Sequence, residues 1–208
     1  MELRNLGLPY SALAVLPTPF EEAPRFAKAL GSRARIFIKR DDSTGLALGG
    51  NKARKLEFLV GDAIAKGCDT LITCGGPQSN HARMTAAAAR KVGMHPVLVL
   101  DGDDPLTRQG NLLLDYLLGA EIVFSGERES GDMLEEISER GKRPYVIPLG
   151  GSNPLGAAGY MSCSAELASQ SAAAGVVPKA VYSATGSCGT MAGLLLGRIL
   201  AGGTFHSI

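Results

Sequence analysis

The stretch Gly49-Gly50-Asn51-Lys52-Ala53-Arg54-Lys55-Leu56-Glu57 joins a glycine turn to an apolar pattern with helical spacing. Asn51 stands at the position of a helix N-cap. The first turn then holds Lys52, Arg54 and Lys55, although the helix dipole disfavours cations there. Such a departure from a local rule is typical of a functional site. It favours phosphate binding by cations and N–H groups, and a lysine whose pKa this positive field lowers toward a nucleophilic amine. The alternative is a basic helix start on the surface.

Composition limits the classes of protein that remain. The 208 residues suffice for one large domain or two small ones, and 45% are apolar. Lys and Arg number 21 against 20 Asp and Glu, which argues against a nucleic-acid partner. The four cysteines form no CxxC pair, so neither a metal site nor a disulfide framework is expected. The sequence shows no secretory signal and no apolar run of membrane-spanning length, and we expect a cytoplasmic protein without a membrane partner.

Strand and helix patterns alternate along the chain, which predicts an α/β fold. We expect strands at 34–40, 70–74, 96–100, 121–124, 145–147 and 179–183. We expect helices at 25–30, from 52 onward, and at 82–92, 111–118, 132–140, 156–174 and 191–200. Short apolar strands that alternate with helices predict parallel sheets covered on both faces, in three α/β/α layers.

A second candidate stretch, Cys74 to Arg83, lies between an expected strand and an expected helix. Ser79 and Asn80 are helix-capping residues, and the N–H groups at such a helix start suit a small carboxylate. The alternative is an ordinary capped turn. His81 is either a proton carrier or a hydrogen-bonded surface group.

The third candidate is Ser183 to Gly193, again between a strand and a helix. Its glycines and hydroxyls predict a phosphate cradle. No lysine precedes Thr190, so it is not a P-loop, and the glycine spacing does not match a dinucleotide site. A phosphate that belongs to no nucleotide is favoured. Together with a reactive lysine and a carboxylate site, this indicates pyridoxal phosphate and an amino-acid substrate.

At these stretches the sequence resembles the D-cysteine desulfhydrase and 1-aminocyclopropane-1-carboxylate deaminase family. These are pyridoxal-phosphate enzymes of the tryptophan-synthase-β fold type, fold type II. The matching segments are Pro17-Thr18-Pro19, Lys39-Arg40-Asp41-Asp42, GGNKARKLE at 49–57, GGPQSNHAR at 75–83, PLGGSNPLGAAGY at 148–160 and ATGSCGTMAGL at 184–194. The resemblance implies a smaller lobe at 51–159 and a larger cofactor-binding lobe from 1–50 plus 160–208. Family members continue well beyond the last helix, so the larger lobe is expected to be incomplete.

The resemblance also implies roles for the candidate residues. Lys52 would bond to the cofactor aldehyde and later move the substrate Cα proton. Ser79, with the backbone of Asn80 and His81, would hold the substrate carboxylate, and Ser79 would also touch the reacting centre. The Asn80 side chain would hydrogen-bond the 3′-oxygen of the cofactor. Lys55 would help neutralise its phosphate, which would be wrapped by Thr185, Gly186, Ser187, Cys188, Gly189 and Thr190.

The activity implied is that of a D-cysteine desulfhydrase-like lyase, which releases sulfide, pyruvate and ammonia by β-elimination. His81 and Gly150-Gly151-Ser152-Asn153 resemble the desulfhydrase side, whereas Met191 departs from the polar residue common in the family. The alternatives are 1-aminocyclopropane-1-carboxylate deaminase and L-cysteate sulfo-lyase. A different class is a truncated remnant without catalysis, which either binds the cofactor or an anion or does neither. Family members are typically homodimers.

Overall fold

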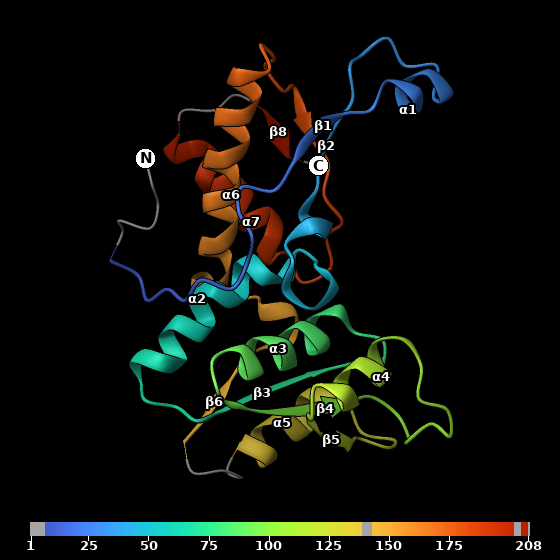
Figure 1. The fold of residues 1–208 in the computed structure, drawn as a ribbon, viewed down its shortest axis with the longest axis vertical. Helices are drawn as coiled ribbons and strands as arrows, with labels where there is room; N and C mark the ends of the chain where they lie inside the picture. The colour runs from blue at the N-terminus through green and yellow to red at the C-terminus, as the bar shows by residue number, and fades with distance from the viewer. Residues whose placement is uncertain (1–6, 139–142, 202–204, 208) are drawn as a thin grey trace.

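The computed structural model describes residues 7–138, 143–201 and 205–207. A four-stranded sheet fills the lower part of the molecule in Figure 1. Its strands are β3 (Thr70–Gly75), β4 (His95–Leu100), β5 (Glu121–Phe124) and β6 (Pro144–Val146). They run in the order β5-β4-β3-β6, and every pair is parallel. The predicted α/β fold with a parallel sheet is therefore confirmed.

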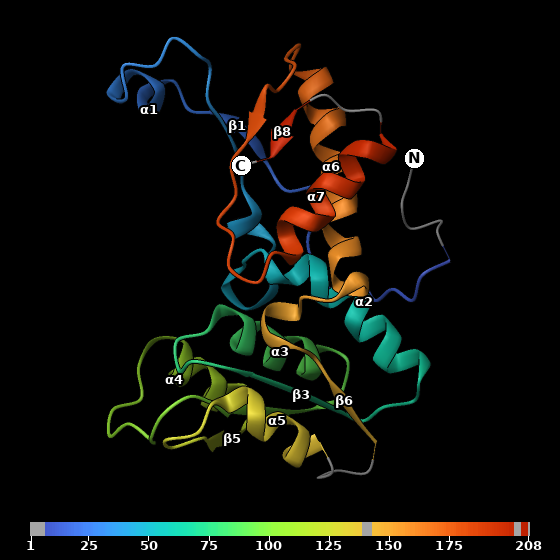
Figure 2. The same ribbon diagram turned by 180° about the vertical axis from the view of Figure 1, so that it is seen from behind.

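Helices cover both faces of this sheet. They are α3 (Asn80–Lys91), α4 (Gly110–Leu117) and α5 (Ser130–Ser138). Every residue of β3 is buried, and alternate residues point to opposite faces. Ile72 and Cys74 pack with Leu134 and Ile137 of α5, whereas the other face of the sheet packs against α3 and α4. The result is the predicted three-layer arrangement (Figure 2).

The upper part of the molecule is built on two helices, α6 (Pro154–Ala173) and α7 (Gly189–Leu200), which pack along each other. Helix α2 (Lys52–Ala65) packs on α6 and also on α3, so it joins the two parts. At Gly159 the backbones of α6 and α2 meet: a Cβ there would lie 2.1 Å from the Arg54 carbonyl oxygen. This close approach sets where the first turn of α2 lies.

The N-terminal segment holds an antiparallel pair that the sequence did not predict. Strands β1 (Phe20–Glu22) and β2 (Phe37–Lys39) flank helix α1 (Pro24–Ala29), and Glu21 lies opposite Ile38. The expected strand at 34–40 is thus shorter than predicted, because only three residues find a partner. The expected strand at 179–183 is likewise reduced to β7 (Ala180–Val181), which pairs with β8 (His206–Ser207).

Three short 3₁₀ turns complete the described elements: Asp41–Ser43, Leu46–Leu48 and Leu149–Gly151. The expected end of the helix at 132–140 lies partly outside the described residues. Within the described ranges, each helix is too short or too polar to cross a membrane. The division into lobes at 51–159 and 1–50 plus 160–208 stays a prediction.

Candidate functional site

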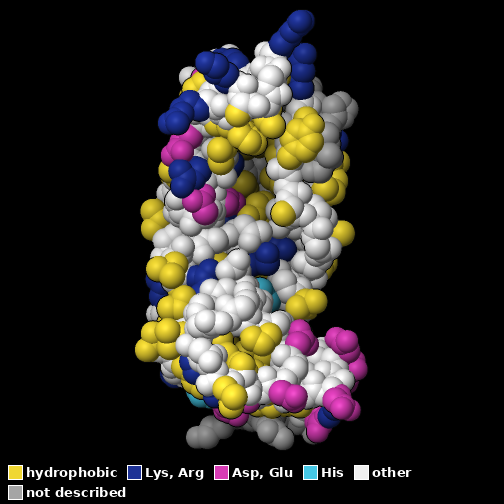
Figure 3. All heavy atoms as spheres, turned by 90° about the vertical axis from the view of Figure 1, so that its right-hand side faces the viewer, with side chains coloured by type: hydrophobic (Ala, Val, Ile, Leu, Met, Phe, Trp, Pro, Cys, Tyr) yellow, Lys and Arg dark blue, Asp and Glu magenta, His cyan; other side chains and the backbone are white. Residues whose placement is uncertain are grey.

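A cavity of about 620 Å³ lies where the start of α2, helix α6 and the segment before α7 meet. Its wall includes Lys52 from α2 and Tyr160 from α6. It also includes Thr185, Gly186 and Thr190 from the turn before α7, more than 130 positions after Lys52 in the sequence. Two of the three candidate stretches therefore share one cavity. Figure 3 shows basic side chains at about mid-height on one face of the molecule.

Lys52 is the first residue of α2 and is partly buried. Its Nζ donates to Oδ1 of Asn51 at 3.1 Å. Burial lowers the pKa of Lys52, so the cause differs from the positive field that the sequence predicted. Asn51 is the residue that precedes α2, as predicted for an N-cap, but its side chain does not cap the helix. Asn51 itself has helical angles, and its side chain makes no capping hydrogen bond because it faces Lys52 instead.

The loop that delivers Lys52 is held in a strained shape. Ala47 and Leu48 have positive φ angles of 43° and 68°, which non-glycine residues rarely adopt. The hydroxyl of Thr44 fixes the end of the loop, since it donates to the Gly50 carbonyl at 2.8 Å and accepts from the Gly50 N–H at 2.9 Å. A Cβ at Gly49 would lie 1.8 Å from the Asp42 carbonyl oxygen, so glycine is required there.

Lys55 lies against the turn that precedes α7. Its buried Nζ donates to the Gly150 carbonyl and to Ser152 Oγ, each at 3.1 Å, and Ser152 Oγ lies 2.6 Å from Ser187 Oγ. A Cβ at Gly189 would lie 2.8 Å from Nζ of Lys55. Burial, followed by the charge of Lys52, lowers the pKa of Lys55 to about 8. Ser152 was assigned no role from the sequence, although it stands in the GGSNPLG segment.

The turn itself is open toward solvent. Cys188 has a left-handed φ of 59° at the N-cap of α7, and Gly189 follows as a buried first helical residue. Thr185, Gly186 and Ser187 are exposed, and Thr190 is half-buried. A helix N-terminus leaves its first N–H groups without helical partners, and such groups bind anions.

Ser79, Asn80 and His81 stand at the start of α3, outside the set of residues that line the cavity. Ser79 is the N-cap, as predicted, and its Oγ accepts from the Ala82 N–H at 3.2 Å. The exposed Asn80 accepts hydrogen bonds at Oδ1 from Arg83 and Asn111. The sequence did not identify either donor, although Arg83 stands out as a cation in an otherwise alanine-rich helix.

His81 is buried, with 3% of its surface exposed, so the expectation of a surface group is wrong. Its Nε2 lies 2.9 Å from the Thr73 hydroxyl. Burial, followed by the charges of Lys52 and Lys55, lowers the pKa of His81 to about 3. The imidazole is therefore neutral near pH 7. Because the charges of Lys52 and Lys55 both lower this pKa, the start of α3 lies within the electrostatic field of the two lysines.

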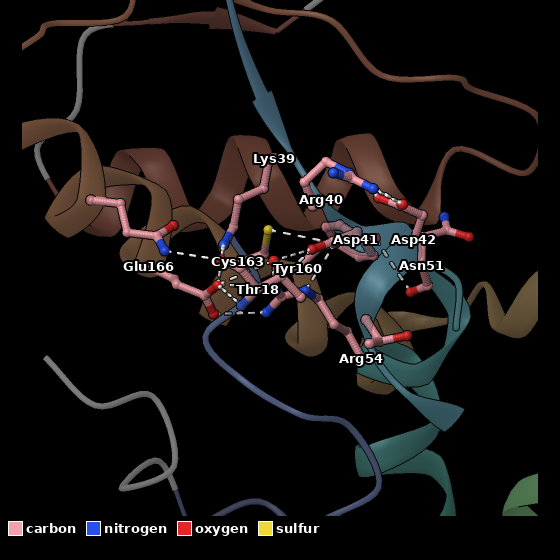
Figure 4. Close-up of polar contacts among 12 residues, drawn as sticks. Thr18, Lys39, Arg40, Asp41, Asp42, Asn51, Arg54, Tyr160, Cys163 and Glu166 are labelled. Atoms are coloured by element: carbon pink, nitrogen blue, oxygen red, sulfur yellow. Dashed lines mark hydrogen bonds and ion pairs between the residues drawn. The ribbon is translucent and has the colours of Figure 1, made fainter. Parts of the chain in front are cut away.

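A buried ionic network lies beside the cavity and contributes Lys39, Asp41 and Tyr160 to its wall; Figure 4 shows its members. Arg54 is fully buried and donates to Asp41 at 2.9 Å and to Glu166 at 3.0 Å. Lys39 contacts Glu166 as well. The Tyr160 hydroxyl donates to Asp41 at 2.9 Å and lies 3.3 Å from the Asn51 carbonyl oxygen, next to Lys52. The network thus ties the N-terminal segment and α6 to the turn that carries Lys52.

Comparison with known proteins gives consistent results. A family model described as pyridoxal-phosphate dependent enzyme matches residues 12–207. A D-cysteine desulfhydrase of Klebsiella pneumoniae (strain 342) is 47% identical over 208 residues, which cover 95% of this chain and 62% of that protein. A Pyrococcus abyssi (strain GE5 / Orsay) protein provisionally named 1-aminocyclopropane-1-carboxylate deaminase is 46% identical over 190 residues, which cover 88% of this chain and 56% of that protein.

Among solved structures, a crystal structure of an ACC deaminase homologue superposes with a TM-score of 0.89 at 41% identity. The match covers 98% of this chain and 63% of that one. The chain therefore spans between 56% and 63% of the length of these three relatives.

Proposed function

The chain belongs to the pyridoxal-phosphate-dependent enzyme family, and we propose that it functions as an amino-acid lyase whose reactive amine is Lys52. The observation that carries this proposal is the shared cavity, which is lined by Lys52 and by Thr185, Gly186 and Thr190 of the turn before α7. A lysine and an anion-binding turn in one cavity are what a phosphorylated aldehyde requires.

The side chains present fit such a cofactor. The two cations Lys52 and Lys55 have no carboxylate partner among the ion pairs of the described residues. Where these amines are protonated, no carboxylate offsets their charge, and a phosphate would do so. Asp41 also lines the cavity, but Arg54 and Tyr160 already occupy its oxygens. The exposed turn and the open space around Gly186 leave room for the phosphate oxygens.

The residues of the chain then have distinct tasks. The lowered pKa of Lys52 leaves more of its amine neutral and nucleophilic, which suits bonding to an aldehyde and removal of the substrate Cα proton. Lys55 and the N–H groups of the turn hold the phosphate. Ser79 and the backbone of Asn80 and His81 hold the substrate carboxylate at the start of α3, and the Asn80 side chain binds the 3′-oxygen. When bound, the cofactor draws electrons from the substrate Cα.

The substrate that we propose is D-cysteine. With one water, its β-elimination gives sulfide, pyruvate and ammonia, so atoms balance without an oxidant or reductant. The relative from Klebsiella pneumoniae carries this activity in its name. 1-Aminocyclopropane-1-carboxylate and L-cysteate remain the alternative substrates, and the first is named in the Pyrococcus relative.

Pyruvate release from D-cysteine tests the proposal, with Lys52→Ala as the decisive variant. We expect a loss of about 10²–10⁴-fold, the size typical for a removed proton-transfer group. Lys66→Ala is the matched control, because Lys66 follows the same helix but pairs with Asp62 on the surface. Equal activity in Lys52→Ala and the parent chain contradicts the proposal.

A parallel assay separates the substrates by their products. D-Cysteine yields sulfide with pyruvate, L-cysteate yields sulfite with pyruvate, and the cyclopropane amino acid yields a four-carbon 2-oxo acid. The ratio of kcat/KM values then assigns the activity. Preference for the cyclopropane substrate contradicts the desulfhydrase proposal without affecting the role of Lys52.

A remnant without catalysis, which binds the cofactor or an anion or does neither, is the competing class. Titration with pyridoxal phosphate separates the classes. A visible band that is lost in Lys52→Ala indicates cofactor binding, and turnover distinguishes an enzyme from a binder. No band and no turnover favour the remnant.

The setting of the protein is also a proposal. Four free cysteines fit a reducing cytoplasm. A homodimer with lobes at 51–159 and 1–50 plus 160–208 follows from the family resemblance. Light scattering tests the dimer, and a monomer mass across micromolar concentrations contradicts it.

A further inference from the structure

The amide of Asn80 has a defined orientation, because its oxygen receives two donors. Nη2 of Arg83 lies 3.3 Å from Oδ1, and Nδ2 of Asn111 lies 2.9 Å from the same atom. A guanidinium carries donors only, so the atom that faces it must be the amide oxygen rather than the nitrogen. The Nδ2 group of Asn80 is therefore directed away from this pair.

The amide of Asn111 is fixed by the same kind of argument. Its Nδ2 donates to the main-chain oxygen of Gln78 at 2.8 Å, and a carbonyl is an acceptor only. Its backbone N–H also donates to Oε1 of Gln78 at 2.9 Å. Asn111 is the second residue of α4 and Gln78 lies two residues before α3, so this contact holds the start of one helix against the start of the other.

Arg83 has a second contact, which reaches the loop before Lys52. The same Nη2 atom donates to the Gly49 carbonyl at 3.0 Å. That loop carries the positive φ angles of Ala47 and Leu48, a shape that persists only where neighbouring groups determine it. One nitrogen of a buried arginine thus contacts the loop that delivers Lys52 and the side chain of Asn80.

We propose that Arg83 and Asn111 are positioning residues of the cofactor site, which turn the Asn80 amide so that it presents N–H donors and which fix it relative to the Lys52 loop. An anionic oxygen at the site requires such a donor, whereas a flipped amide would present an oxygen and repel it. The inference rests on the proposed function for the identity of the oxygen, but the orientation of Asn80 does not depend on it.

The experiment has two measurements on the same full chain. The first is side-chain amide NMR without cofactor, with the Asn80 resonance assigned from its loss in Asn80→Ala. The second is the Kd for pyridoxal phosphate from its absorption titration. Each is carried out on the parent chain, Asn111→Ala and Arg83→Lys. Asn111 is partly exposed, so we expect Asn111→Ala to fold, and this variant keeps the test valid even if Arg83→Lys does not fold.

Matched controls lie on the same two helices. Arg90→Lys removes an arginine of α3 that also binds carbonyls, those of Leu118 and Gly119, but far along the helix from Asn80. Gln109→Ala changes the residue before α4. Gln109 accepts from Gln78 Nε2 with its main-chain oxygen, so the substitution keeps this contact.

We expect the Asn80 amide to be ordered in the parent chain and in both controls, and mobile in Asn111→Ala and Arg83→Lys. We expect both of these variants to raise the Kd about five- to tenfold, the loss expected for a weakened hydrogen bond to a charged group. An Asn80 amide that stays ordered in Asn111→Ala overturns the proposal, and so does a Kd that follows the controls. A parent chain that binds no cofactor contradicts the proposed function instead, and the NMR measurement still decides the orientation.

Discussion

Arg54 and Arg83 are both buried near the candidate site, but they differ in how many of their nitrogen atoms have hydrogen-bond partners. Arg54 is fully buried and has three oxygen-bearing partners, Asp41, Glu166 and Thr18. Arg83 is 4% exposed, and its Nε and Nη1 atoms are without hydrogen-bond partners among the described residues. Nearby Asp115 is fully buried, and both of its oxygens are equally without partners in the described ranges.

The pKa values follow this difference. Burial opposes the charge of Arg54, but the electrostatic effect of Cys163, the hydrogen bonds to Glu166 and Asp41 and the charge of Asp41 outweigh it, and the pKa of Arg54 is raised. The pKa of Arg83 is lowered by burial, which the charge of Asp115 offsets only in part. We call Arg54 with Asp41 and Glu166 the closed network, because its charges are paired, and it holds α2 against α6. We call Arg83 with Asp115 the open network, because their charges are not paired by hydrogen bonds. The guanidinium of Arg83 instead donates to the Gly49 carbonyl and to Asn80, which belong to the proposed site.

The largest expected effect comes from opening the closed network. Arg54→Met leaves the carboxylates of Asp41 and Glu166 buried without their main counter-charge. We expect the free energy of unfolding in urea to fall by about 3–5 kcal/mol, as for other broken buried pairs. The triple variant with Asp41→Asn and Glu166→Gln serves as control and should regain part of this loss. A loss below about 1 kcal/mol in Arg54→Met would contradict the claim that Arg54 is the main counter-charge of these carboxylates.

We expect the uncompensated Asp115 of the open network to make the free energy of unfolding depend on pH. Burial raises the pKa of Asp115 to about 7 from 3.8. The folded state therefore binds a proton more tightly than the unfolded state, and this contribution is complete below the unfolded pKa and is lost as the pH rises to about 7. Relative to Asp115→Asn, we expect the parent chain to lose about 2–4 kcal/mol of stability over that range, at about 1.4 kcal/mol per pKa unit.

Urea unfolding of both proteins at a series of pH values measures this difference. Asp69→Asn, a change at a more exposed carboxylate paired with Arg143, is the control. Parallel pH profiles of the parent chain and Asp115→Asn would show that Asp115 is as well compensated as Asp41, contrary to the comparison.

Arg83→Met should cost less than Arg54→Met. It removes the two hydrogen bonds that Arg83 donates, together with a buried cation whose Nε and Nη1 atoms have no hydrogen-bond partners in the described ranges. We expect a loss of about 1–2 kcal/mol in urea unfolding near pH 7. A loss as large as that of Arg54→Met would mean that the two arginines have the same structural weight.

The smallest effect is expected at the rim of the closed network. Lys39 contacts Glu166 and the Thr18 carbonyl, and its side chain is 13% exposed. In Lys39→Met the carboxylate of Glu166 keeps Arg54 as its partner, so we expect a loss of no more than about 1 kcal/mol. Thermal and urea unfolding both measure it. A loss above that of Arg83→Met would show that the network depends on both cations.

Much of the fold was predictable because it depends on local patterns. The strand at 121–124 was placed at its observed bounds, and most other strands and helices lie within a few residues of theirs. The helix start at Lys52 was predictable from the apolar pattern that follows it, and the role of its three cations stays a proposal. The Ser79 cap was recognised because a hydroxyl residue precedes a helical pattern.

The parts that were missed depend on partners far away in the sequence. Arg54 and Glu166 are separated by 112 positions, and nothing local indicates their contact. The burial of His81 depends on Thr73 and on the loop near Gly151, which covers it. Asn51 is a residue type that often caps helices, but it has helical angles, and its Oδ1 accepts from Lys52 instead.

The central claim is that Lys52 is the amine that bonds to the cofactor. The most direct test is to incubate the chain with pyridoxal phosphate, reduce the adduct with borohydride and locate the label by peptide mass spectrometry. We predict a single labelled lysine at position 52, which is lost in Lys52→Ala. A label on Lys39 or Lys55, or one spread over the exposed lysines, would contradict the account.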